Sequence, residues 1–491
     1  QWNELVVYEL HVGTFSSDPE ASGRGTFQSL VGKLDALVDL GVNAIELMAS
    51  GEFGTDISWG YNPDYIFAVE HAYGGPDGFR AFVRAAHQRG IAVVFDVVYN
   101  HLGTTDLDLW RFDGWSQSDG GGIYFYEDWR RTTPWGDTRP DYGRGEVRQY
   151  LRDNALRWLE QRCCDGLRWD ATAFIRNAHG RDDDPGADIP DGWSLMQWIH
   201  REIAARQPWK ISIAEDMQGN EWVTNDVGAG GAGFGAQWDS ASLHAVRGAL
   251  AATSDADRSM SAVADALRRR FSGRAFARVV YVESHDEVTS ANDPGKARVP
   301  TMIDPGNPTG WFARKRAALG STLVFTAPGI PMIFQGEEFF DESPFDDEVL
   351  LDWGKRASRP GALALHRDLI RLRRNWFDHT RGLRGDSVNV HHVNDADKLV
   401  AYHRWAAGGP RDDVVVLLNF ADRAYDDYRF GLPRGGLWRV RFNSDARVYA
   451  GDFGDHPGFD TWTDGGAMDG MPCSASVGVG AYSALILSQD G

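Results

Sequence analysis

Hydrophobic residues in the first three-quarters of the chain follow two alternating patterns. Short apolar runs such as "IAVVFDVVYNH" (91–101) and "ARVVYVESHD" (277–286) are typical of parallel strands that are buried on both faces. Between these runs lie longer segments in which an apolar residue recurs every three or four positions, as it does on one face of a helix. We count eight strand–helix repeats, and the sixth strand, in "GAQWDS" (235–240), has the weakest pattern.

This alternation predicts an α/β fold in which eight parallel strands close into a (β/α)₈ TIM barrel. A doubly wound open sheet is the less economical alternative, because no glycine-rich dinucleotide loop follows the first strand. In the first repeat, residues 27–41 predict a single helix that stops at Gly41 and turns one face inward. That face is formed by Leu30, Leu34, Leu37 and Val38.

Two stretches depart from the repeat. Residues 102–144 follow the third strand as a long aromatic, glycine-rich segment, and loops of this length inside a compact domain are usually functional. After about Asn375 the pattern changes to short strands, which predicts a separate antiparallel β domain. We therefore expect a barrel domain over 1–378 with a short inserted subdomain at 102–144, and a C-terminal antiparallel β-sandwich over 379–491.

Composition and charge limit the cellular environment and the partners that we expect for the chain. The chain has 491 residues and a formal net charge of −20, so we expect no nucleic-acid partner, because phosphates would be repelled. No stretch is long and apolar enough to cross a bilayer, so we expect no membrane partner. The three cysteines Cys163, Cys164 and Cys473 offer neither a disulfide framework nor zinc-ligand spacing. Together with an N-terminus that has no signal pattern, they predict a cytoplasmic chain.

Polar side chains gather where the predicted strands end, which is where barrels of this kind carry their chemistry. The third, fourth, fifth and seventh strands are mostly apolar inside and end in Asp96, Asn100, His101, Arg168, Asp170, Glu215, His285 and Asp286. Carboxylates that converge on one rim repel one another unless cations and hydrogen bonds compensate them. Arg168 is the fixed cation of this set, and the histidines are hydrogen-bond donors.

Converging carboxylates are compatible with two chemistries, namely the binding of a divalent metal and the cleavage of a glycosidic bond by a carboxylate pair. Arg168 lies two residues before Asp170 and would compete with a metal ion there. This spacing favours glycoside cleavage, and we expect neither a metal nor a cofactor. A purely structural interpretation of this segment stays open, in which Arg168 and Asp170 form a buried ion pair in the barrel wall.

The polar strand ends form four motifs, "DVVYNH" (96–101), "GLRWDA" (166–171), "IAED" (213–216) and "SHDE" (284–287). In this order and on these strands, they resemble the motifs of the α-amylase superfamily of glycoside hydrolases and transglycosylases. The segment "SWGYNPDY" (58–65) adds to the match. Four motifs on matching strands are specific, whereas any one of them alone is a weak signal.

The resemblance implies a retaining mechanism with defined roles. Asp170 would be the nucleophile that forms a covalent glycosyl–enzyme intermediate, and Glu215 would protonate the leaving oxygen and then deprotonate the incoming hydroxyl. Asp286 would bind sugar hydroxyls and stabilise the oxocarbenium-like transition state. A retaining mechanism needs two carboxyls about 5–5.5 Å apart with different pKa values. We expect Arg168 to lower the pKa of Asp170 and burial to raise the pKa of Glu215.

The same resemblance implies a set of substrate-binding residues. His101 and His285 would hydrogen-bond hydroxyls of the sugar that is cleaved, and Tyr61 would stack on its apolar face. Asp96 and Asn100 either brace the loop and the arginine or contact the substrate directly. Asn100 as a ligand of a structural calcium ion is a further alternative, although no aspartate cluster stands out in the loop that follows it. Three aromatic residues of the inserted segment are interpreted either as core or as a platform for an acceptor sugar, namely Trp129, Trp135 and Tyr142.

Two groups within the superfamily compete as the nearest resemblance, and both imply an α-glucan or maltooligosaccharide substrate. The segment 128–171 and the C-terminal strands resemble glycogen (1,4-α-glucan) branching enzymes, whereas "YELHVGTF" (8–15) and "GAQWDSASLHAV" (235–246) resemble maltooligosyltrehalose trehalohydrolases. The first hypothesis is cleavage of α-1,4 bonds with transfer to a 6-hydroxyl, and the second is hydrolysis. A non-catalytic glucan-binding protein is the third, and the presence of both Asp170 and Glu215 argues against it.

Overall fold

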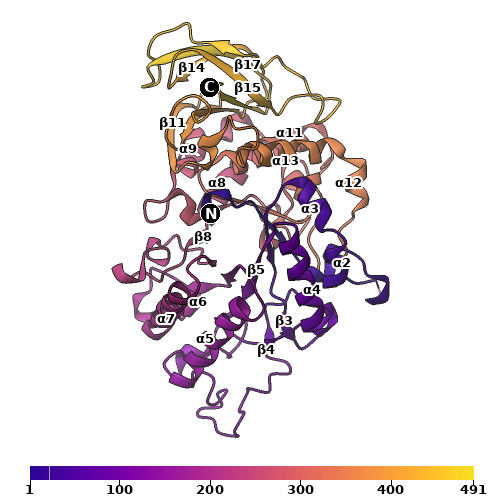
Figure 1. Ribbon diagram of the computed structural model, residues 1–491, viewed down its shortest axis with the longest axis vertical. Helices are drawn as coiled ribbons and strands as arrows, with labels where there is room; N and C mark the ends of the chain where they lie inside the picture. Colours follow the sequence, from indigo (N-terminus) through magenta and orange to yellow (C-terminus); the bar gives the residue numbers. More distant parts are fainter. Residues whose placement is uncertain (22) are drawn as a thin grey trace.

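Eight parallel strands of the computed structural model, which describes residues 1–21 and 23–491, close into a barrel (Figure 1). Around the barrel the order is β1-β10-β9-β8-β7-β6-β5-β2. The strands are β1 (Val7–Leu10), β2 (Ala44–Leu47), β5 (Ala92–Val97), β6 (Gly166–Trp169), β7 (Ile211–Ala214), β8 (Ala236–Trp238), β9 (Arg278–Val280) and β10 (Ile330–Phe334). The predicted TIM barrel is confirmed, and its weakest predicted strand, the sixth, is the short β8.

Helices alternate with these strands along the chain and bury one face against them. The longer ones are α3 (Leu34–Leu40), α4 (Gly75–Gln88), α5 (Gly145–Glu160), α7 (Pro190–Arg206), α8 (Ser240–Ala251), α9 (Met260–Arg268), α11 (Trp311–Thr326) and α13 (Pro360–Arg373). Single-turn helices are α1 (Val12–Phe15), α2 (Phe27–Val31), α6 (Thr172–Arg176), α10 (Val299–Ile303) and α12 (Gly354–Ser358). Within the described ranges, none of the helices combines the length and the apolar character that crossing a bilayer requires.

The helix predicted over residues 27–41 is broken in the structure. Helix α2 ends at Val31, and α3 begins at Leu34 after a break at Gly32 and Lys33. Glycine is a poor helix former, and the break rotates the second half relative to the first. Leu34 and Leu37 therefore face the core as predicted, but Val38 is 39% exposed, so its predicted inward position is wrong.

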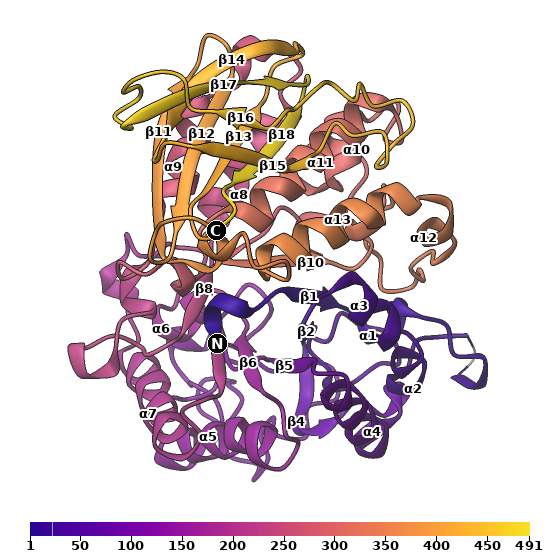
Figure 2. The same ribbon diagram turned by 45° about the horizontal axis from the view of Figure 1, so that its top comes forward.

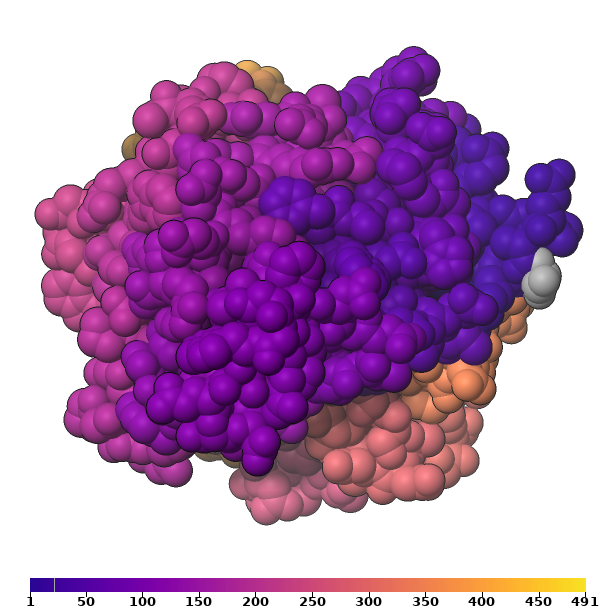
Figure 3. Space-filling model, turned by 90° about the horizontal axis from the view of Figure 1, so that it is seen from below, coloured from indigo at the N-terminus to yellow at the C-terminus, as the bar shows by residue number. Residues whose placement is uncertain are grey.

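Two irregular regions lie beside the carboxyl end of the barrel. The first is an antiparallel hairpin of β3 (Gly51–Phe53) and β4 (Pro63–Val69). The second is the segment from the end of β5 to the start of α5, whose regular structure is the 3-10 turn Trp129–Arg131 and isolated bridges such as Phe125 with Pro140. In Figure 3 the purple surface of this segment lies beside the indigo surface of the N-terminal part of the chain.

The C-terminal part forms two antiparallel sheets (Figure 2). The six-stranded sheet has the order β11-β12-β13-β18-β15-β16, and the two-stranded sheet pairs β14 with β17. Their bounds are β11 (Ser387–Asn394), β12 (Leu399–Trp405), β13 (Val414–Asn419), β14 (Tyr425–Leu432), β15 (Leu437–Asn443), β16 (Thr461–Trp462), β17 (Cys473–Val479) and β18 (Ser483–Ser488). This arrangement confirms the predicted antiparallel C-terminal domain.

Strand β12 shows how the six-stranded sheet buries both of its faces. Successive side chains of a strand point to opposite faces. Leu399 and Ala401 pack in a cluster with residues of β14 and β17, whereas Val400 and Tyr402 join the core of the barrel helices. The sheet is therefore the middle layer between the barrel and the two-stranded sheet.

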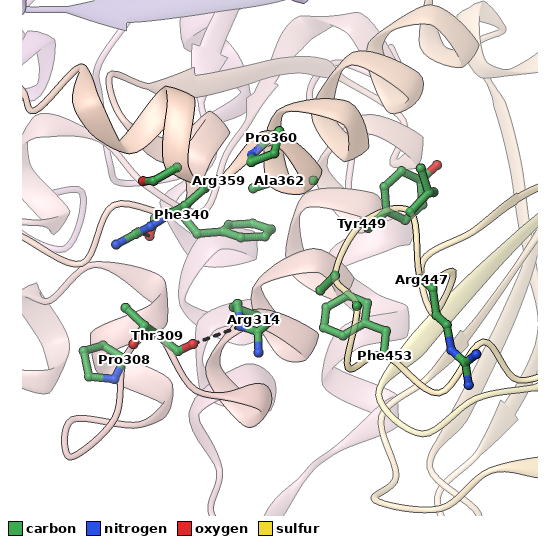
Figure 4. A pocket seen from close by; sticks show the side chains of 15 residues that line it. Pro308, Thr309, Arg314, Phe340, Arg359, Pro360, Ala362, Arg447, Tyr449 and Phe453 are labelled. Carbon is green, nitrogen blue, oxygen red and sulfur yellow. Dashed lines mark hydrogen bonds between the residues drawn. The ribbon is translucent and has the colours of Figure 1, made fainter.

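The barrel and the C-terminal sheets also enclose a cavity of about 460 Å³. Figure 4 shows Phe340 from the barrel on one side of it, and Tyr449 and Phe453 from the loop after β15 on the other. Arg314 of α11 donates a hydrogen bond from Nε to the Thr309 carbonyl (2.9 Å) at its edge. None of the predicted site residues lines this cavity.

Candidate active site

Three neighbouring strands bring four of the predicted residues together. Strand β5 pairs with β6 so that Asp96 lies opposite Arg168, and β7 pairs with β6 so that Ile213 lies opposite Arg168. Asp170 and Glu215 follow the ends of β6 and β7 on the same rim. The parallel register thus places the carboxylates around one arginine.

The Arg168 guanidinium is the centre of this group and is completely buried. Its Nη1 donates to Asp96 Oδ2 (2.7 Å) and Asp170 Oδ1 (3.1 Å). Its Nη2 lies 2.8 Å from Glu215 Oε2, in an ion pair without hydrogen-bond geometry. The indole ring of Trp238 covers the guanidinium, with its centroid 4.5 Å from Cζ. One cation therefore serves three carboxylates.

Asn100 orients the carboxylate of Asp170. Its amide nitrogen donates to Asp170 Oδ2 (2.7 Å) and to the Asp170 carbonyl (2.9 Å). The Asn100 carbonyl oxygen contacts His101 Nδ1. Both polar atoms of the Asn100 side chain therefore have partners within the site, as a bracing role requires.

The turn after Asp170 points a backbone donor at Glu215. Ala171 adopts left-handed backbone angles (φ 40°), which residues other than glycine rarely do. In this conformation its N–H donates to Glu215 Oε2 (2.9 Å). Strained backbone of this kind is often found at functional sites, and here it links the two predicted catalytic carboxyls through one peptide.

The predicted direction of the Asp170 pKa is wrong. Burial and the negative charge of Glu215 raise the pKa of Asp170 well above its usual value, against the opposing effects of Arg168 and Asn100. The physical reason is that Arg168 divides its single charge among three carboxylates. Burial likewise raises the pKa of Asp96 to about 6, even though Arg168 donates to it.

His285 and Asp286 reach the same rim from the end of β9, in a 3-10 turn over His285–Glu287. His285 Nδ1 lies 2.5 Å from Glu9 Oε1, and its Nε2 lies 3.6 Å from Asp286 Oδ2. Burial alone would lower the pKa of His285, but the charges of Asp286 and Glu9 raise it to about 9. His285 is therefore an imidazolium at neutral pH, and the Asp286 side chain is 37% exposed beside it.

His101 has the opposite charge state. It is completely buried, and burial lowers its pKa to about 4. Its Nε2 lies 3.2 Å from Asn62 Oδ1, and its ring stacks on Trp135 (centroids 4.8 Å apart, 13° between planes). The two histidines predicted as equivalent donors thus differ, because carboxylates surround only one of them.

The aromatic residues divide between site and core. Tyr61 donates its hydroxyl to Asp96 Oδ2 (2.8 Å), and its ring stacks on His285 (centroids 4.9 Å apart). Trp135 is 40% exposed and Trp129 is 56% exposed, which leaves surface for a ligand. Tyr142 is fully buried and donates to the Tyr99 carbonyl (2.7 Å), so it belongs to the core.

Three residues of the site are missing from the sequence-based prediction. Glu9 holds His285, and Trp238 covers Arg168. Glu46 lies opposite Glu9 in the barrel and is 1% exposed, with neither carboxyl oxygen hydrogen-bonded. Burial and the Glu9 charge raise the pKa of Glu46 well above its usual value. The sequence feature that could have identified Glu9 and Glu46 is a single glutamate inside each of two otherwise apolar strands.

Comparison with known protein families agrees with this geometry. Residues 14–119 match the family described as alpha amylase, catalytic domain, and residues 390–490 match alpha amylase, C-terminal all-beta domain. Two segments of the chain therefore match the catalytic and the C-terminal domains of the α-amylase family. Solved structures of this family share the fold: an Anoxybacillus alpha-amylase (TM-score 0.74, 18% identity, covering 100% of this chain and 99% of that one) and the alpha-amylase of Geobacillus thermoleovorans complexed with acarbose (TM-score 0.73, 19% identity, 99% and 98%).

Curated relatives of the chain carry two kinds of name. The 1,4-alpha-glucan branching enzyme GlgB of Paramagnetospirillum magneticum is 31% identical over 477 residues, which are 91% of this chain and 60% of the relative. The malto-oligosyltrehalose trehalohydrolase of Saccharolobus solfataricus is 32% identical over 367 residues, 70% of this chain and 58% of the relative. The chain therefore spans about three-fifths of the length of the curated relatives it matches.

Proposed function

We propose that the chain is a retaining enzyme that cleaves α-1,4-glucosidic bonds of α-glucans and transfers the released chain to a 6-hydroxyl. The observation that carries this proposal is the contact of Asp170 and Glu215 with one buried guanidinium at the carboxyl ends of neighbouring strands. Retaining cleavage needs a carboxyl pair of this kind, with one member as nucleophile and the other as acid.

In the first step Asp170 attacks the anomeric carbon while Glu215 gives a proton to the leaving glucosidic oxygen. In the second step Glu215 takes a proton from the acceptor hydroxyl, which displaces Asp170 and regenerates both groups. The reaction needs Asp170 ionised and the proton on Glu215. Burial and the charge of Glu215 raise the pKa of Asp170, whereas the donors from Arg168 and Asn100 favour its ionised form.

Asp286 and His285 supply the remaining polar contacts to the sugar. The half-exposed carboxylate of Asp286 is free to accept hydrogen bonds from sugar hydroxyls. The imidazolium of His285, held through Nδ1 by Glu9, presents Nε2–H as a donor on the same side. The hydrogen bonds that the Asp286 carboxylate accepts strengthen as positive charge develops on the ring, which lowers the barrier to cleavage.

Transfer to a 6-hydroxyl is favoured over hydrolysis by the relatives. Branching enzymes match 91% of the chain, whereas the trehalohydrolase matches 70% of it. Hydrolysis of α-glucans or of maltooligosyltrehalose is the second candidate, since that shorter match has the same level of identity, 32%. Both reactions share the first step and differ in whether a sugar hydroxyl or water attacks the intermediate.

Incubation with linear amylose separates the two. We expect new α-1,6 linkages, detected by proton NMR and by debranching of the product, with little gain in reducing ends. An increase in reducing ends without α-1,6 linkages would assign hydrolysis, and the release of trehalose from maltooligosyltrehalose would assign the trehalohydrolase reaction. Asp170→Asn protein is the control for contaminating activity.

A further inference from the structure

A cavity of about 370 Å³ lies beside the barrel rim, between helix α7 and the loop that follows strand β7. Helices α6 and α7 lie side by side at this edge of the barrel (Figure 1). The residues used below are Arg176 of α6, Asp188, Trp193 of α7, and Asn220 and Trp222 of the loop. The volume is in the range of small-ligand sites, and the account of the active site uses none of these residues.

The cavity adjoins Glu215 through one ion pair and one loop. Asp216, the next residue after Glu215, accepts hydrogen bonds from Nε (2.9 Å) and Nη2 (2.7 Å) of Arg176 in the cavity lining. The same loop continues to the 3-10 turn Glu221–Val223, which carries Trp222. Because Glu215 protonates the leaving oxygen and later takes the acceptor's proton, the acceptor approaches on the side of Glu215. The cavity is on this side.

The loop after β7 holds two indole rings at the cavity. Trp222 is 53% exposed, although its N–H donates to Asn220 Oδ1 (3.0 Å) and its carbonyl accepts from the Ala232 N–H (2.9 Å). Trp193 Nε1 donates to the Gly230 carbonyl (3.1 Å), and a Cβ on Gly230 would lie 3.9 Å from Trp222 Cζ3. An aromatic face that is held in place before binding loses little conformational freedom when a sugar ring stacks on it.

The charges around the cavity favour a neutral ligand. Arg176 pairs with the carboxylates of Asp216 and Asp182, so its charge is compensated and attracts a phosphate only weakly. Asp188 accepts from Asn177 Nδ2 through Oδ1 (2.9 Å), and within the described part of the chain its Oδ2 has no hydrogen-bond partner. A carboxylate oxygen of this kind accepts hydroxyl groups and repels anions. An exposed indole face beside such an oxygen fits a sugar ring.

We propose that this cavity binds the acceptor glucan chain, with a glucosyl ring on the exposed face of Trp222 and a hydroxyl on Asp188. This assignment rests on the proposed function and adds to it the place where the acceptor is held. A chain bound beside Glu215 presents its hydroxyl to the glycosyl–enzyme intermediate at a high effective concentration. Water gains nothing from this binding, so an occupied cavity favours transfer over hydrolysis.

The affinity for maltohexaose tests the site in the full chain carrying Asp170→Asn, a background expected to leave the ligand intact. Calorimetric titration should show that Trp222→Ala weakens binding about tenfold, since truncation of a central aromatic contact commonly has an effect of this size. Trp222→Phe keeps an aromatic face and should stay within about threefold of the parent. Trp209→Ala is the matched control, because Trp209 is 69% exposed between α7 and β7 and does not line the cavity. It should leave the affinity unchanged.

Kinetics of the active chain show whether the bound chain is the acceptor. With α-maltosyl fluoride as the donor and maltohexaose as the acceptor, Trp222→Ala should raise the maltohexaose concentration for half-maximal transfer about tenfold. The KM for the donor should change much less. Chromatography of the transfer products measures both quantities.

Equal affinity of Trp222→Ala and its parent for maltohexaose would overturn the inference, whichever reaction the enzyme catalyses. Weaker binding with an unchanged half-saturating acceptor concentration would also overturn it, because the chain held in the cavity would not be the acceptor. A lack of α-1,6 linkages after incubation with amylose would instead count against the proposed function alone, since maltohexaose binding does not depend on the linkage that is formed.

Discussion

At the rim of the barrel, Asp96, Asp170 and Glu215 surround the guanidinium of Arg168. At the β3–β4 hairpin, the buried Asp64 lies near the charge of Asp106, and neither of them forms an ion pair with a described side chain. In the first group the compensating charge is part of the chain, and it is shared among three anions. In the second group the chain supplies little compensation.

This difference bears on what each group can do. At the rim, burial and the charge of Glu215 raise the pKa of Asp170 although Arg168 lies beside it. At the hairpin, burial and the charge of Asp106 raise the pKa of Asp64 to about 6. Substitutions that remove the cation or one of the carboxylates therefore test the comparison.

The largest effect is expected on turnover when either rim carboxyl loses its charge. Asp170→Asn and Glu215→Gln should each lower kcat by about 10³-fold or more, because one removes the nucleophile and the other the acid. Glucosyl fluoride, whose leaving group needs no proton, should restore the first step in Glu215→Gln but not in Asp170→Asn. Equal rescue of both variants would contradict the assigned roles, and circular dichroism should show that both keep the fold.

Removal of the internal cation should have the next largest effect, this time on stability. Arg168→Met leaves three buried carboxylates without their partner, and breaking a buried ion pair on one side costs about 3–5 kcal/mol in the free energy of unfolding. Urea titration measures this loss. Arg89→Met breaks the surface pair with Asp35 and should cause little change, whereas an equal effect of both variants would argue against Arg168 as the shared cation.

Glu9→Gln should change the stability of the fold, and its dependence on pH, by less than Arg168→Met does. The pKa of His285 is raised to about 9. The pairing of protonated His285 with Glu9 and Asp286 therefore stabilises the fold fully below the ordinary histidine pKa of about 6.5. This stabilisation is lost as the pH rises through about 9. The variant should lose about 1.5–3 kcal/mol near pH 7, with a weaker decline between about pH 7 and 10. Urea unfolding across this range measures both.

Glu46→Gln is the matched control for Glu9→Gln, because the two glutamates lie opposite each other on neighbouring strands. Burial and the charge of Glu9 raise the pKa of Glu46, so an amide should replace it with less change in the pH profile than Glu9→Gln causes. If both variants shift the profile equally, Glu9 is not the group that holds His285 charged.

The smallest effect is expected at Asp64 of the hairpin. The pKa of Asp64 is raised to about 6, so its ionised form destabilises the fold, and stability should increase as the pH falls from about 7 to 5. Asp64→Asn should be more stable than the wild-type chain by about 1–2 kcal/mol at pH 7 and nearly flat over this range. A variant less stable than wild type would show that Asp64 is not repelled there.

The sequence predicted the elements whose pattern is local and missed what depends on three-dimensional neighbours. The apolar run 91–101 and the similar runs that alternate with helical segments were sufficient to predict the barrel. The predicted strand ends placed Asp96, Asp170 and Glu215 on one rim. Val38 was misplaced because one glycine breaks the helix phase. The spacing of apolar residues alone does not show such a break in a helix.

Contacts across the barrel were beyond the reach of the sequence. Glu9 precedes His285 by 276 residues, and only closure of the barrel brings the two side chains together. The pKa of Asp170 was predicted from its neighbour Arg168 alone, without the two further carboxylates that the arginine serves.

The most direct test of the central claim is to trap the covalent intermediate. A 5-fluoro-α-glucosyl fluoride, whose ring fluorine slows the second step, should label the chain once when added to Glu215→Gln, and peptide mass mapping should locate the ester. The account predicts the label on Asp170. A label on Asp286 or on any other residue, or inversion at the anomeric carbon with no label, would contradict it.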